Sequence, residues 1–302
     1  MSGVAPTMFA DEIPSDAELV RRLLQAQFPE WAGLPIERVE LVGTDNALYR
    51  LGDDLVVRLP RRHRPAETLE KECEWLPRLG PLLPLPVPVP VARGAAGEVY
   101  PLPWAVYRWV PGERATPERI GDQRRFATDL VQFIAGLQRI DPANGPPPGM
   151  HNFGRGEPLL ARDEQTRAAI RSLGSAIDVA QVTAVWEDAL DAPVWQGPPL
   201  WIHGDLDRQN LLVLDGRLSG VVDFGALGVG DPACDVMVVW KVLARNDREL
   251  FRQALAVDEP TWMRARGWVV SQAVRALDYY TLDTHPVLVR EARLWLAGVL
   301  AA

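Results

Sequence analysis

A dense polar run stands between two apolar, β-like segments in the C-terminal half of the chain: His203-Gly204-Asp205-Leu206-Asp207-Arg208-Gln209-Asn210. A second motif, Asp223-Phe224-Gly225, follows two short apolar runs that flank Asp215-Gly216. Asp-Gly between two such runs predicts a β-hairpin, which would return Asp223 toward Asp205 and Asn210. Two carboxylates and an amide at one place suit a hard cation such as Mg²⁺, which prefers a few oxygen ligands and is shared with phosphates.

The carboxylate that is not needed by the cation could orient a hydroxyl group and accept its proton. Positioning of that kind, together with neutralisation of phosphate charge, is what phosphoryl transfer requires. The alternative interpretation is a polar turn with capping aspartates. Because both motifs occur in this order and are joined by a predicted hairpin, the pattern favours the catalytic interpretation.

The elements that must position these residues change in character along the chain. Helical spacing predicts a helix over 16–28 and another over 66–79, and three β-like runs lie between them at 36–43, 47–52 and 54–60. Alternate prolines predict an extended connector over 81–94, because proline removes backbone donors, and one or two strands follow over 99–110. After 110 the pattern is mainly helical, with helices over 124–140, 161–173 and 180–190 and a β-like island over 200–225. The natural boundary lies near Val110 and Pro111.

Composition limits the class of protein. With 302 residues, 47% of them hydrophobic and 24% charged, the chain can bury two cores. A net charge of −8 argues against nucleic acid and anionic membrane surfaces as partners. The acidic N-terminus predicts no secretory signal, no apolar run reaches the roughly 18 residues of a membrane span, and Cys73 and Cys234 have no metal-ligand spacing. We therefore expect a cytoplasmic monomer or weak dimer.

The runs HGDLDRQN, VVDFG and GDPACD resemble those of the aminoglycoside phosphotransferase family, antibiotic and small-molecule kinases with a protein-kinase-like fold. The resemblance covers nearly the whole chain. It implies an α+β, two-lobed fold, with a small antiparallel sheet in the N-terminal lobe and a larger, mainly helical C-terminal lobe. Residues 1–110 would form the nucleotide-binding lobe, and residues 111–302 the catalytic and acceptor-binding lobe.

Carried over position by position, the resemblance gives Asp205 the role of catalytic base. Asn210 and Asp223 match the two Mg²⁺ ligands. Asp235 matches an aspartate that hydrogen-bonds the backbone of the catalytic loop, and His203 matches a histidine that braces this loop. Asp231 is interpreted as a helix cap before Pro232.

In the N-terminal lobe, Arg58 stands where the family usually has a lysine that holds the nucleotide phosphates. A guanidinium can keep that role, because it is always charged and fits phosphate and carboxylate. Its partner should be Glu72, with Glu70 as the alternative and Glu74 the least favoured by register. The turn 43–47 matches the phosphate-covering turn, where backbone amides with Thr44 and Asn46 would contact phosphates, although an ordinary hairpin is an equal alternative.

The resemblance places the nucleotide base at 107–112, against the carbonyl of Arg108 and the amide of Val110. The acceptor site is less defined. Region 157–191 has seven acidic residues against three arginines, and an acidic lip would attract a polycationic aminoglycoside, but solvated outer helix faces explain the same pattern. Aromatic side chains that could line the acceptor pocket, or belong to the core, are Trp240, Trp268, Tyr279 and Tyr280.

The resulting expectation is a kinase that transfers the γ-phosphoryl group of ATP or GTP, with Mg²⁺, to a hydroxyl of a small-molecule acceptor. An aminoglycoside is the favoured acceptor. Alternatives are a macrolide, or a metabolite alcohol such as a choline-like or sugar substrate. A pseudokinase that only binds nucleotide is the alternative of another class. A protein kinase is disfavoured, because no Ala-Pro-Glu segment follows Asp223-Phe224-Gly225.

Overall fold

The structure, a computed structural model, describes residues 12–39, 46–62 and 66–301, and it divides into two compact units. The first unit contains the chain up to Pro111 together with Gly220–Gly225. The second contains Gly112–Ser219 and the chain from Ala226 onward. The sequence pattern gives no sign that the segment 220–225 returns to the first unit.

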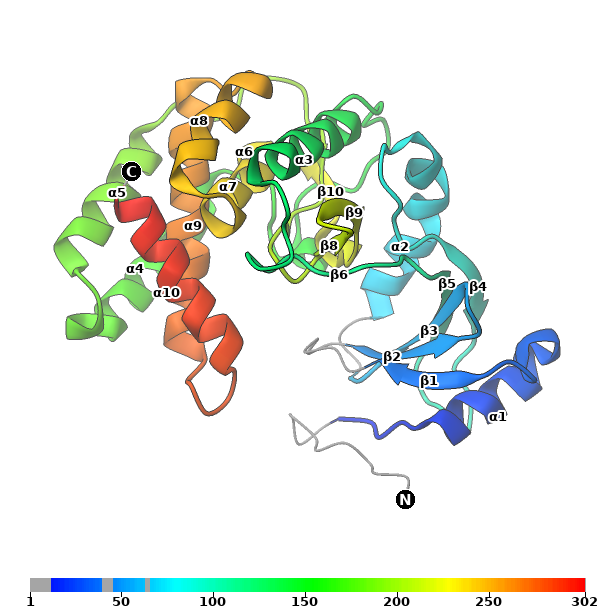
Figure 1. The fold of residues 1–302 in the computed structure, drawn as a ribbon. Helices are drawn as coiled ribbons and strands as arrows, with labels where there is room; N and C mark the ends of the chain where they lie inside the picture. Colours follow the sequence, from blue (N-terminus) through cyan, green and yellow to red (C-terminus); the bar gives the residue numbers. More distant parts are fainter. Residues whose placement is uncertain (1–11, 40–45, 63–65, 302) are drawn as a thin grey trace. The chain divides into compact units, whose positions relative to one another are not determined.

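The first unit is built on one antiparallel sheet with the strand order β1-β2-β3-β5-β4 (Figure 1). Its strands are β1 (Ile36–Val39), β2 (Asn46–Leu51), β3 (Leu55–Pro60), β4 (Pro90–Gly94) and β5 (Trp104–Arg108). Its α-helices in the described residues are α1 (Ala17–Gln27) and α2 (Ala66–Leu79). The predicted helices and the second and third predicted strands are thus confirmed within a few residues; the first is confirmed over 36–39, and its predicted end at 40–43 lies outside the described residues.

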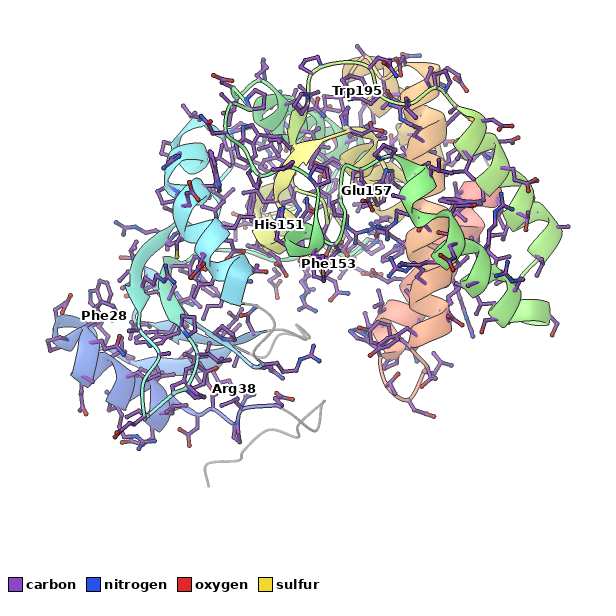
Figure 2. The ribbon with its side chains drawn as sticks, turned by 180° about the vertical axis from the view of Figure 1, so that it is seen from behind. Phe28, Arg38, His151, Phe153, Glu157 and Trp195 are labelled. Carbon is purple, nitrogen blue, oxygen red and sulfur yellow. The ribbon has the colours of Figure 1, made fainter. Side chains whose placement is uncertain are left out.

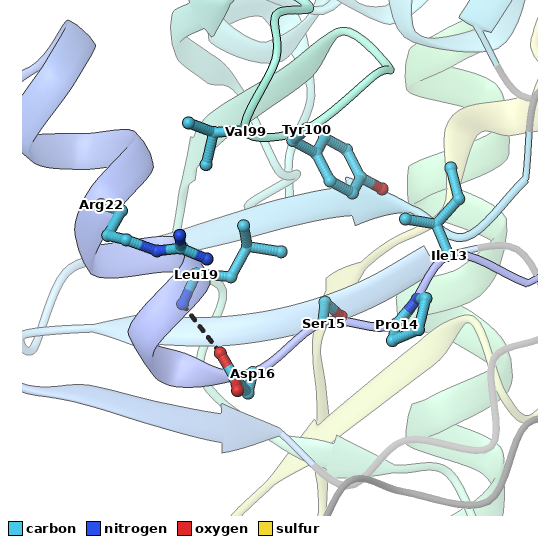
Figure 3. A pocket seen from close by; sticks show the side chains of 8 residues that line it. All are labelled: Ile13, Pro14, Ser15, Asp16, Leu19, Arg22, Val99 and Tyr100. Carbon is cyan, nitrogen blue, oxygen red and sulfur yellow. Dashed lines mark hydrogen bonds between the residues drawn. The ribbon is translucent and has the colours of Figure 1, made fainter.

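Helix α1 starts where the sequence provides a cap. The Asp16 carboxylate accepts the Leu19 amide at 2.7 Å, which satisfies one of the free donors of the first turn (Figure 3). Leu19, Val20, Leu23 and Leu24 then repeat at helical spacing and are all buried. This apolar face anchors α1 to the sheet.

The two faces of the sheet carry different elements, because side chains alternate along a strand. Val57, Leu59, Trp104 and Val106 pack with α1 in one cluster. Val56, Ala105 and Tyr107 form the opposite cluster with Leu69 of α2. By the same alternation, Arg58 points to the α2 side. The strand period therefore turns Arg58 and Tyr107 toward the helix that carries Glu72.

The proline-rich segment is extended over most of its length, as predicted, but its end joins the sheet. A short 3₁₀ turn, Gly80–Leu82, comes first, and β4 begins at Pro90. β4 is an edge strand, and its register against β5 shifts between Pro90 and Ala92. An edge position tolerates proline because one side of the strand needs no donors.

The second unit is mainly helical. Its α-helices are α3 (Gln123–Gln138), α4 (Asp163–Leu173), α5 (Val179–Asp191), α6 (Ala233–Val236), α7 (Val238–Val242), α8 (Arg245–Ala254), α9 (Glu259–Tyr279) and α10 (Pro286–Leu300). Its short strands are β6 (Glu113–Arg114), β7 (Leu200–Ile202), β8 (Leu211–Leu214), β9 (Arg217–Val221, which ends in the first unit) and β10 (Gly228–Gly230). Helix α9 packs against α4, α5, α6 and α10 and forms the centre of this unit (Figure 1).

The predicted hairpin is present as β8 and β9, which lie side by side in a small sheet with β6. Asp215 and Gly216 join them with φ values of 51° and 78°. Positive φ at both positions is the geometry of the tight turn that Asp-Gly favours. The predicted α+β architecture, with an antiparallel N-terminal sheet and a helical C-terminal part, is confirmed.

Candidate active site

Arg58 on β3 and Glu72 on α2 form a buried ion pair in the first unit. Nη1 of Arg58 lies 2.9 Å from Oε1 and 2.7 Å from Oε2 of Glu72, whose side chain has no exposed surface. The Tyr107 hydroxyl donates to the same Oε2 at 2.7 Å. Burial acts against the charge of Arg58, but the attraction of Glu72, with that of Tyr107 and Asp223, outweighs it and raises the pKa of Arg58. The guanidinium charge is therefore permanent.

The two alternative glutamates on α2 have other neighbours. Glu70 binds Arg93 at 2.7 Å on the surface. Glu74 lies 3.8 Å from Arg78, four residues later on the same helix, where both side chains are more than half exposed. The structure therefore pairs Arg58 with Glu72.

The Asp223-Phe224-Gly225 turn belongs to the same unit and lies against this pair. Nη2 of Arg58 is 3.7 Å from Oδ1 of Asp223, and the Gly225 amide donates to that Oδ1 at 3.3 Å. The Asp223 side chain remains 54% exposed. Nζ of Lys71, the residue before Glu72, donates to the Gly225 carbonyl at 2.9 Å. Helix α2 thus contacts Arg58 of β3 through Glu72 and the backbone of the turn through Lys71.

Lys71 is a site residue that the sequence reasoning missed. It is buried, and burial lowers its pKa to about 8, although Glu72 and Asp223 attract its charge. The signal was available in the helical spacing. Lys71 precedes Trp75 by four residues and so occupies a position on the apolar stripe of α2, where a lysine is uncommon.

In the second unit, Asp235 holds the backbone of the catalytic loop. Its Oδ2 accepts the His203 amide and its Oδ1 accepts the Gly204 amide, both at 2.8 Å. Burial raises the pKa of Asp235, while His203 and the two amide hydrogen bonds oppose this change. The contacts are those that the family resemblance implies for this aspartate.

His203 and Gly204 shape the loop around Asp205. His203 is fully buried, and its Nδ1 accepts the Asp205 amide at 3.2 Å. Gly204 has a φ of +82°, and a Cβ there would lie 2.5 Å from the Ala226 carbonyl oxygen. Only glycine fits this approach without strain. The loop backbone before Asp205 is therefore held from both sides.

Asp205 itself is open to solvent, with 38% of its side chain exposed. Nδ2 of Asn210 donates to the Asp205 carbonyl at 2.8 Å, which links the two ends of the polar motif. Nη2 of Arg155 lies 3.5 Å from Oδ1 of Asp205. Asp207, two residues on, is buried, and burial with the charge of Asp205 raises its pKa to about 7. The exposed carboxylate in this motif is thus Asp205, not Asp207.

The donor set for a metal ion is small. Among the described residues, no group of three or more His, Cys, Asp or Glu side chains is placed to hold one. Asn210 uses its amide nitrogen within the loop, which leaves its Oδ1 for a cation, and Asp223 offers an exposed carboxylate. One carboxylate and one amide oxygen fit Mg²⁺, which keeps waters and binds through a few protein oxygens plus phosphates. They do not fit zinc.

Asp231 does more than cap a helix. Its Oδ1 accepts the Ala233 amide at 3.0 Å, as a capping residue would. In addition, its two oxygens bind Nε and Nη2 of Arg264 on α9, at 2.6 and 3.1 Å, and both side chains are buried. The cap interpretation is therefore incomplete, because the ion pair joins two segments that are 33 residues apart.

The remaining predicted nucleotide contacts are less informative. Thr44 lies outside the described residues, and Asn46 opens β2 opposite Pro60. Arg108 ends β5, and its amide donates to the Val89 carbonyl at 2.9 Å. Val110 is buried, with its side chain facing Gly220. The nucleotide roles of these residues stay predictions.

Most acidic residues of region 157–191 have partners within their own unit. Glu157 lies 3.7 Å from Arg162, while Arg167 binds both Asp163 and Glu187. Asp178 caps α5 through the Gln181 amide. The exposed acids of this region without such a contact to another described residue are Glu164, Asp188 and Asp191. The solvated-face interpretation explains this region better than an acidic lip.

Two of the aromatic candidates for an acceptor pocket belong to the core. Trp240 is 3% exposed, and Trp268 has no exposed surface, whereas Tyr279 is 74% exposed. A pocket of about 230 Å³ lies elsewhere, between the start of α1 and the segment with Val99 and Tyr100 (Figure 3). None of the predicted site residues lines it.

No helix in the described ranges is long and apolar enough to cross a membrane.

Known proteins share this sequence pattern. A profile of the phosphotransferase enzyme family matches residues 37–268. An aminoglycoside 3'-phosphotransferase of Streptomyces fradiae is 30% identical over 191 residues, which cover 61% of this chain and 66% of that protein. The chain thus spans a little less than two thirds of the length of this relative.

Solved structures share the fold. The GDP complex of wild-type aminoglycoside 2'-phosphotransferase-IIIa is 20% identical, with a TM-score of 0.72 over 94% of this chain and 99% of that one. The macrolide 2'-phosphotransferase MphH from Brachybacterium faecium is 23% identical, with a TM-score of 0.63 over 95% and 97% of the two chains. This likeness confirms the predicted kinase-like fold. Together with the profile, which covers most of the chain, it shows that the protein belongs to the phosphotransferase enzyme family.

Proposed function

We propose that this protein transfers the γ-phosphoryl group of ATP or GTP to a hydroxyl group of a small molecule. The observation that carries the proposal is the state of Asp205. His203 and Asn210 bond its backbone, Asp235 holds the two residues before it, and its carboxylate stays exposed. A rigid loop that presents one accessible carboxylate is suited to align a hydroxyl and accept its proton. Family membership supports this reaction class.

The proposed roles divide between the two parts of the chain. Residues 1–110 would bind the nucleotide, and residues 111–302 would supply the base and bind the acceptor. Arg58 would contact the nucleotide phosphates, with Glu72 fixing its orientation. Asn210 and Asp223 would hold Mg²⁺, which neutralises phosphate charge when bound. In the first unit the exposed Asp223 carboxylate lies 3.7 Å from Nη2 of Arg58 on β3, which supports these roles.

For the acceptor, similarity favours an antibiotic. The Streptomyces fradiae relative is an aminoglycoside 3'-phosphotransferase, and one structural neighbour is a macrolide 2'-phosphotransferase. An aminoglycoside is therefore the first acceptor class to test. A metabolite alcohol is the second candidate, and a specific observation favours it: the acidic residues of region 157–191 are mostly paired, and an arginine lies beside Asp205.

The test is a screen for nucleotide consumption by the purified protein, with ATP and with GTP, against panels of antibiotics and metabolite alcohols. For any acceptor that is phosphorylated, Asp205→Asn should lower turnover by a factor on the order of 10²–10⁴, because a positioned general base is lost. Mg-nucleotide affinity should change little. Asp215→Asn makes the same change at the exposed hairpin turn of the second unit and serves as the matched control.

Two results would contradict the proposal. If no acceptor in either panel is phosphorylated while nucleotide still binds, the pseudokinase alternative is correct. If Asp205→Asn phosphorylates an acceptor as fast as the wild type, Asp205 is not the base, even though the family assignment stands.

A further inference from the structure

Two arginines lie over Trp268 in the second unit, beside Asp205, and the charge of a third, Arg275, repels them. We call them the arginine cluster: Arg155, Arg162 and Arg275. The guanidinium of Arg162 lies 4.7 Å, and that of Arg155 5.8 Å, from the centre of the Trp268 ring. Burial, with the repulsion of the other two arginines, lowers the pKa of Arg162 to about 10. Like charges are thus held close enough to act on one another.

The members of the cluster differ in how their donors are used. Arg162 is buried; its Nε donates to the Ser271 hydroxyl at 3.2 Å and its Nη1 to the Phe153 carbonyl at 3.0 Å. Arg155 faces Asp205 at 3.5 Å, too far for a short charge-assisted hydrogen bond. Its Nε is buried and has no hydrogen-bond partner among the described residues. Of Arg155 and Arg162, Arg155 is therefore the one with donors left for a ligand.

The loop that carries Arg155 is built to aim it. Gly154 and Gly156 have φ values of +66° and +83°, which other residues rarely adopt. A Cβ on Gly156 would lie 2.8 Å from Ile202 and 3.1 Å from the backbone of Gly230. The side-chain amide of Asn152 also donates to the Arg155 carbonyl at 3.0 Å.

This loop is tied to the rest of its unit. The Gly156 carbonyl accepts the Asp231 amide at 2.9 Å, so the loop is bonded to the segment that leads into α6. Figure 2 labels His151, Phe153 and Glu157 along the loop. A loop held this closely presents Arg155 to the catalytic carboxylate at a defined place.

The carboxylates that form ion pairs with the arginine cluster are fewer than its arginines. The nearby carboxylates with ion pairs to it are Asp205 and Glu157, and Glu157 lies 3.7 Å from Arg162. Burial raises the pKa of Glu157, which disfavours its charged form. Three guanidinium groups therefore face two carboxylates, one of which must stay accessible for the reaction.

We propose that Arg155 binds an anionic group of the acceptor, a carboxylate or a phosphate, next to the hydroxyl that is phosphorylated. The inference rests on the proposed phosphoryl transfer and, between its two acceptor candidates, favours a metabolite alcohol over an aminoglycoside. A planar guanidinium with free donors matches carboxylate and phosphate oxygens. The same charge repels an ammonium group beside Asp205. The acceptor is then a hydroxy acid or a sugar phosphate rather than a polycationic aminoglycoside.

The test measures binding, not turnover, so that it does not depend on finding the natural acceptor. Four probes share one hydroxyl scaffold and differ in charge: glycerol 3-phosphate, glycerate, glycerol and serinol, which carries an ammonium group. Their dissociation constants are measured by NMR titration of the full chain saturated with Mg-ADP, at constant low ionic strength. The variants are Arg155→Gln and Arg155→Lys. The matched control is Arg171→Gln, which removes the same charge from the exposed face of α4 in the same unit.

The wild type should bind the two anions more tightly than glycerol, and serinol most weakly. Arg155→Gln should weaken anion binding by about tenfold to a hundredfold, the usual loss of a charge-assisted contact. Arg155→Lys should restore part of it, and Arg171→Gln should behave as the wild type. The proposal is overturned if Arg155→Gln binds the anions as the wild type does, or if serinol binds better than glycerate. Unchanged Mg-ADP affinity in every variant confirms that they are folded, and failure of the phosphotransferase proposal would appear separately, in the Asp205 screen.

Discussion

The Arg58–Glu72 pair of the first unit and the Asp231–Arg264 pair of the second have nearly the same shortest distance but different surroundings. Arg58 binds Glu72 at 2.7 Å in the first unit, and Arg264 binds Asp231 at 2.6 Å in the second. All three side-chain nitrogens of Arg264 donate hydrogen bonds within the protein, because it also donates to the Pro193 carbonyl and to the Thr261 hydroxyl. Arg58 binds both oxygens of Glu72 with one nitrogen and turns another toward the half-exposed Asp223.

The difference teaches how to separate structural from functional ion pairs. The two pairs have similar distances and similar burial, so neither quantity tells a structural pair from a functional one. The pairs differ in how many nitrogens of the arginine are not hydrogen-bonded within the protein. A saturated arginine can only hold its own elements together, whereas an arginine with a nitrogen directed at an exposed carboxylate can share a ligand with it. We therefore expect the Asp231–Arg264 pair to affect stability and the Arg58–Glu72 pair to affect nucleotide binding.

The largest effect is expected for the saturated pair. Asp231→Ala leaves the buried guanidinium of Arg264 without its carboxylate, and breaking a buried pair in this way costs about 3–5 kcal/mol of unfolding free energy. Urea denaturation measures the change. Glu70→Ala breaks the exposed pair with Arg93 and is the control, with an expected cost of about 0–1 kcal/mol. Equal losses in the two variants would show that the second unit does not depend on Asp231.

A smaller effect is expected for the Arg58–Glu72 pair, and it should appear in nucleotide affinity. A double-mutant cycle with Arg58→Met and Glu72→Gln should give a coupling energy of about 1–3 kcal/mol in Mg-ATP binding, because each residue orients the other. Calorimetry measures the four dissociation constants. Pairing Arg58→Met with Glu70→Gln provides the control, since Glu70 binds Arg93 instead. Additive effects in the first cycle would mean that Arg58 acts independently of Glu72.

The sequence was sufficient wherever local rules decide the outcome. Asp215-Gly216 turns the β8–β9 hairpin, because a tight turn depends on a few adjacent residues. The family resemblance led to Glu72 as the partner of Arg58, with Glu70 as the alternative, and the structure contains the Glu72 pair. The family motif likewise led to Asp235, whose contacts with the loop backbone the structure contains.

What the sequence did not provide depends on contacts between distant segments. Arg155 reaches Asp205 across 50 positions only because two left-handed glycines and a backbone hydrogen bond place its loop. The Asp231–Arg264 pair likewise depends on how α9 packs. The acidic residues of region 157–191 fit both a binding surface and solvated helix faces, and their intramolecular partners decide between the two. Spacing reveals none of these, because partner choice is decided in three dimensions.

The smallest effect concerns Lys71, the second buried cation of the first unit, and it sharpens the contrast with Arg58. A carboxylate raises the pKa of Arg58, whereas Lys71 donates to the neutral carbonyl of Gly225 and burial lowers its pKa to about 8. Between pH 8 and the unperturbed value of 10.5, the unfolded chain therefore binds more protons at this site than the native protein does. The contribution of Lys71 to the free energy of unfolding then rises with pH, by about 1 kcal/mol from pH 8 to pH 9. Lys71→Met removes this contribution, so its stability should lack the rise while all other titrating groups remain the same. Urea denaturation of both proteins at the two pH values measures the difference, and parallel stability curves would show that Lys71 keeps an ordinary pKa in the folded state.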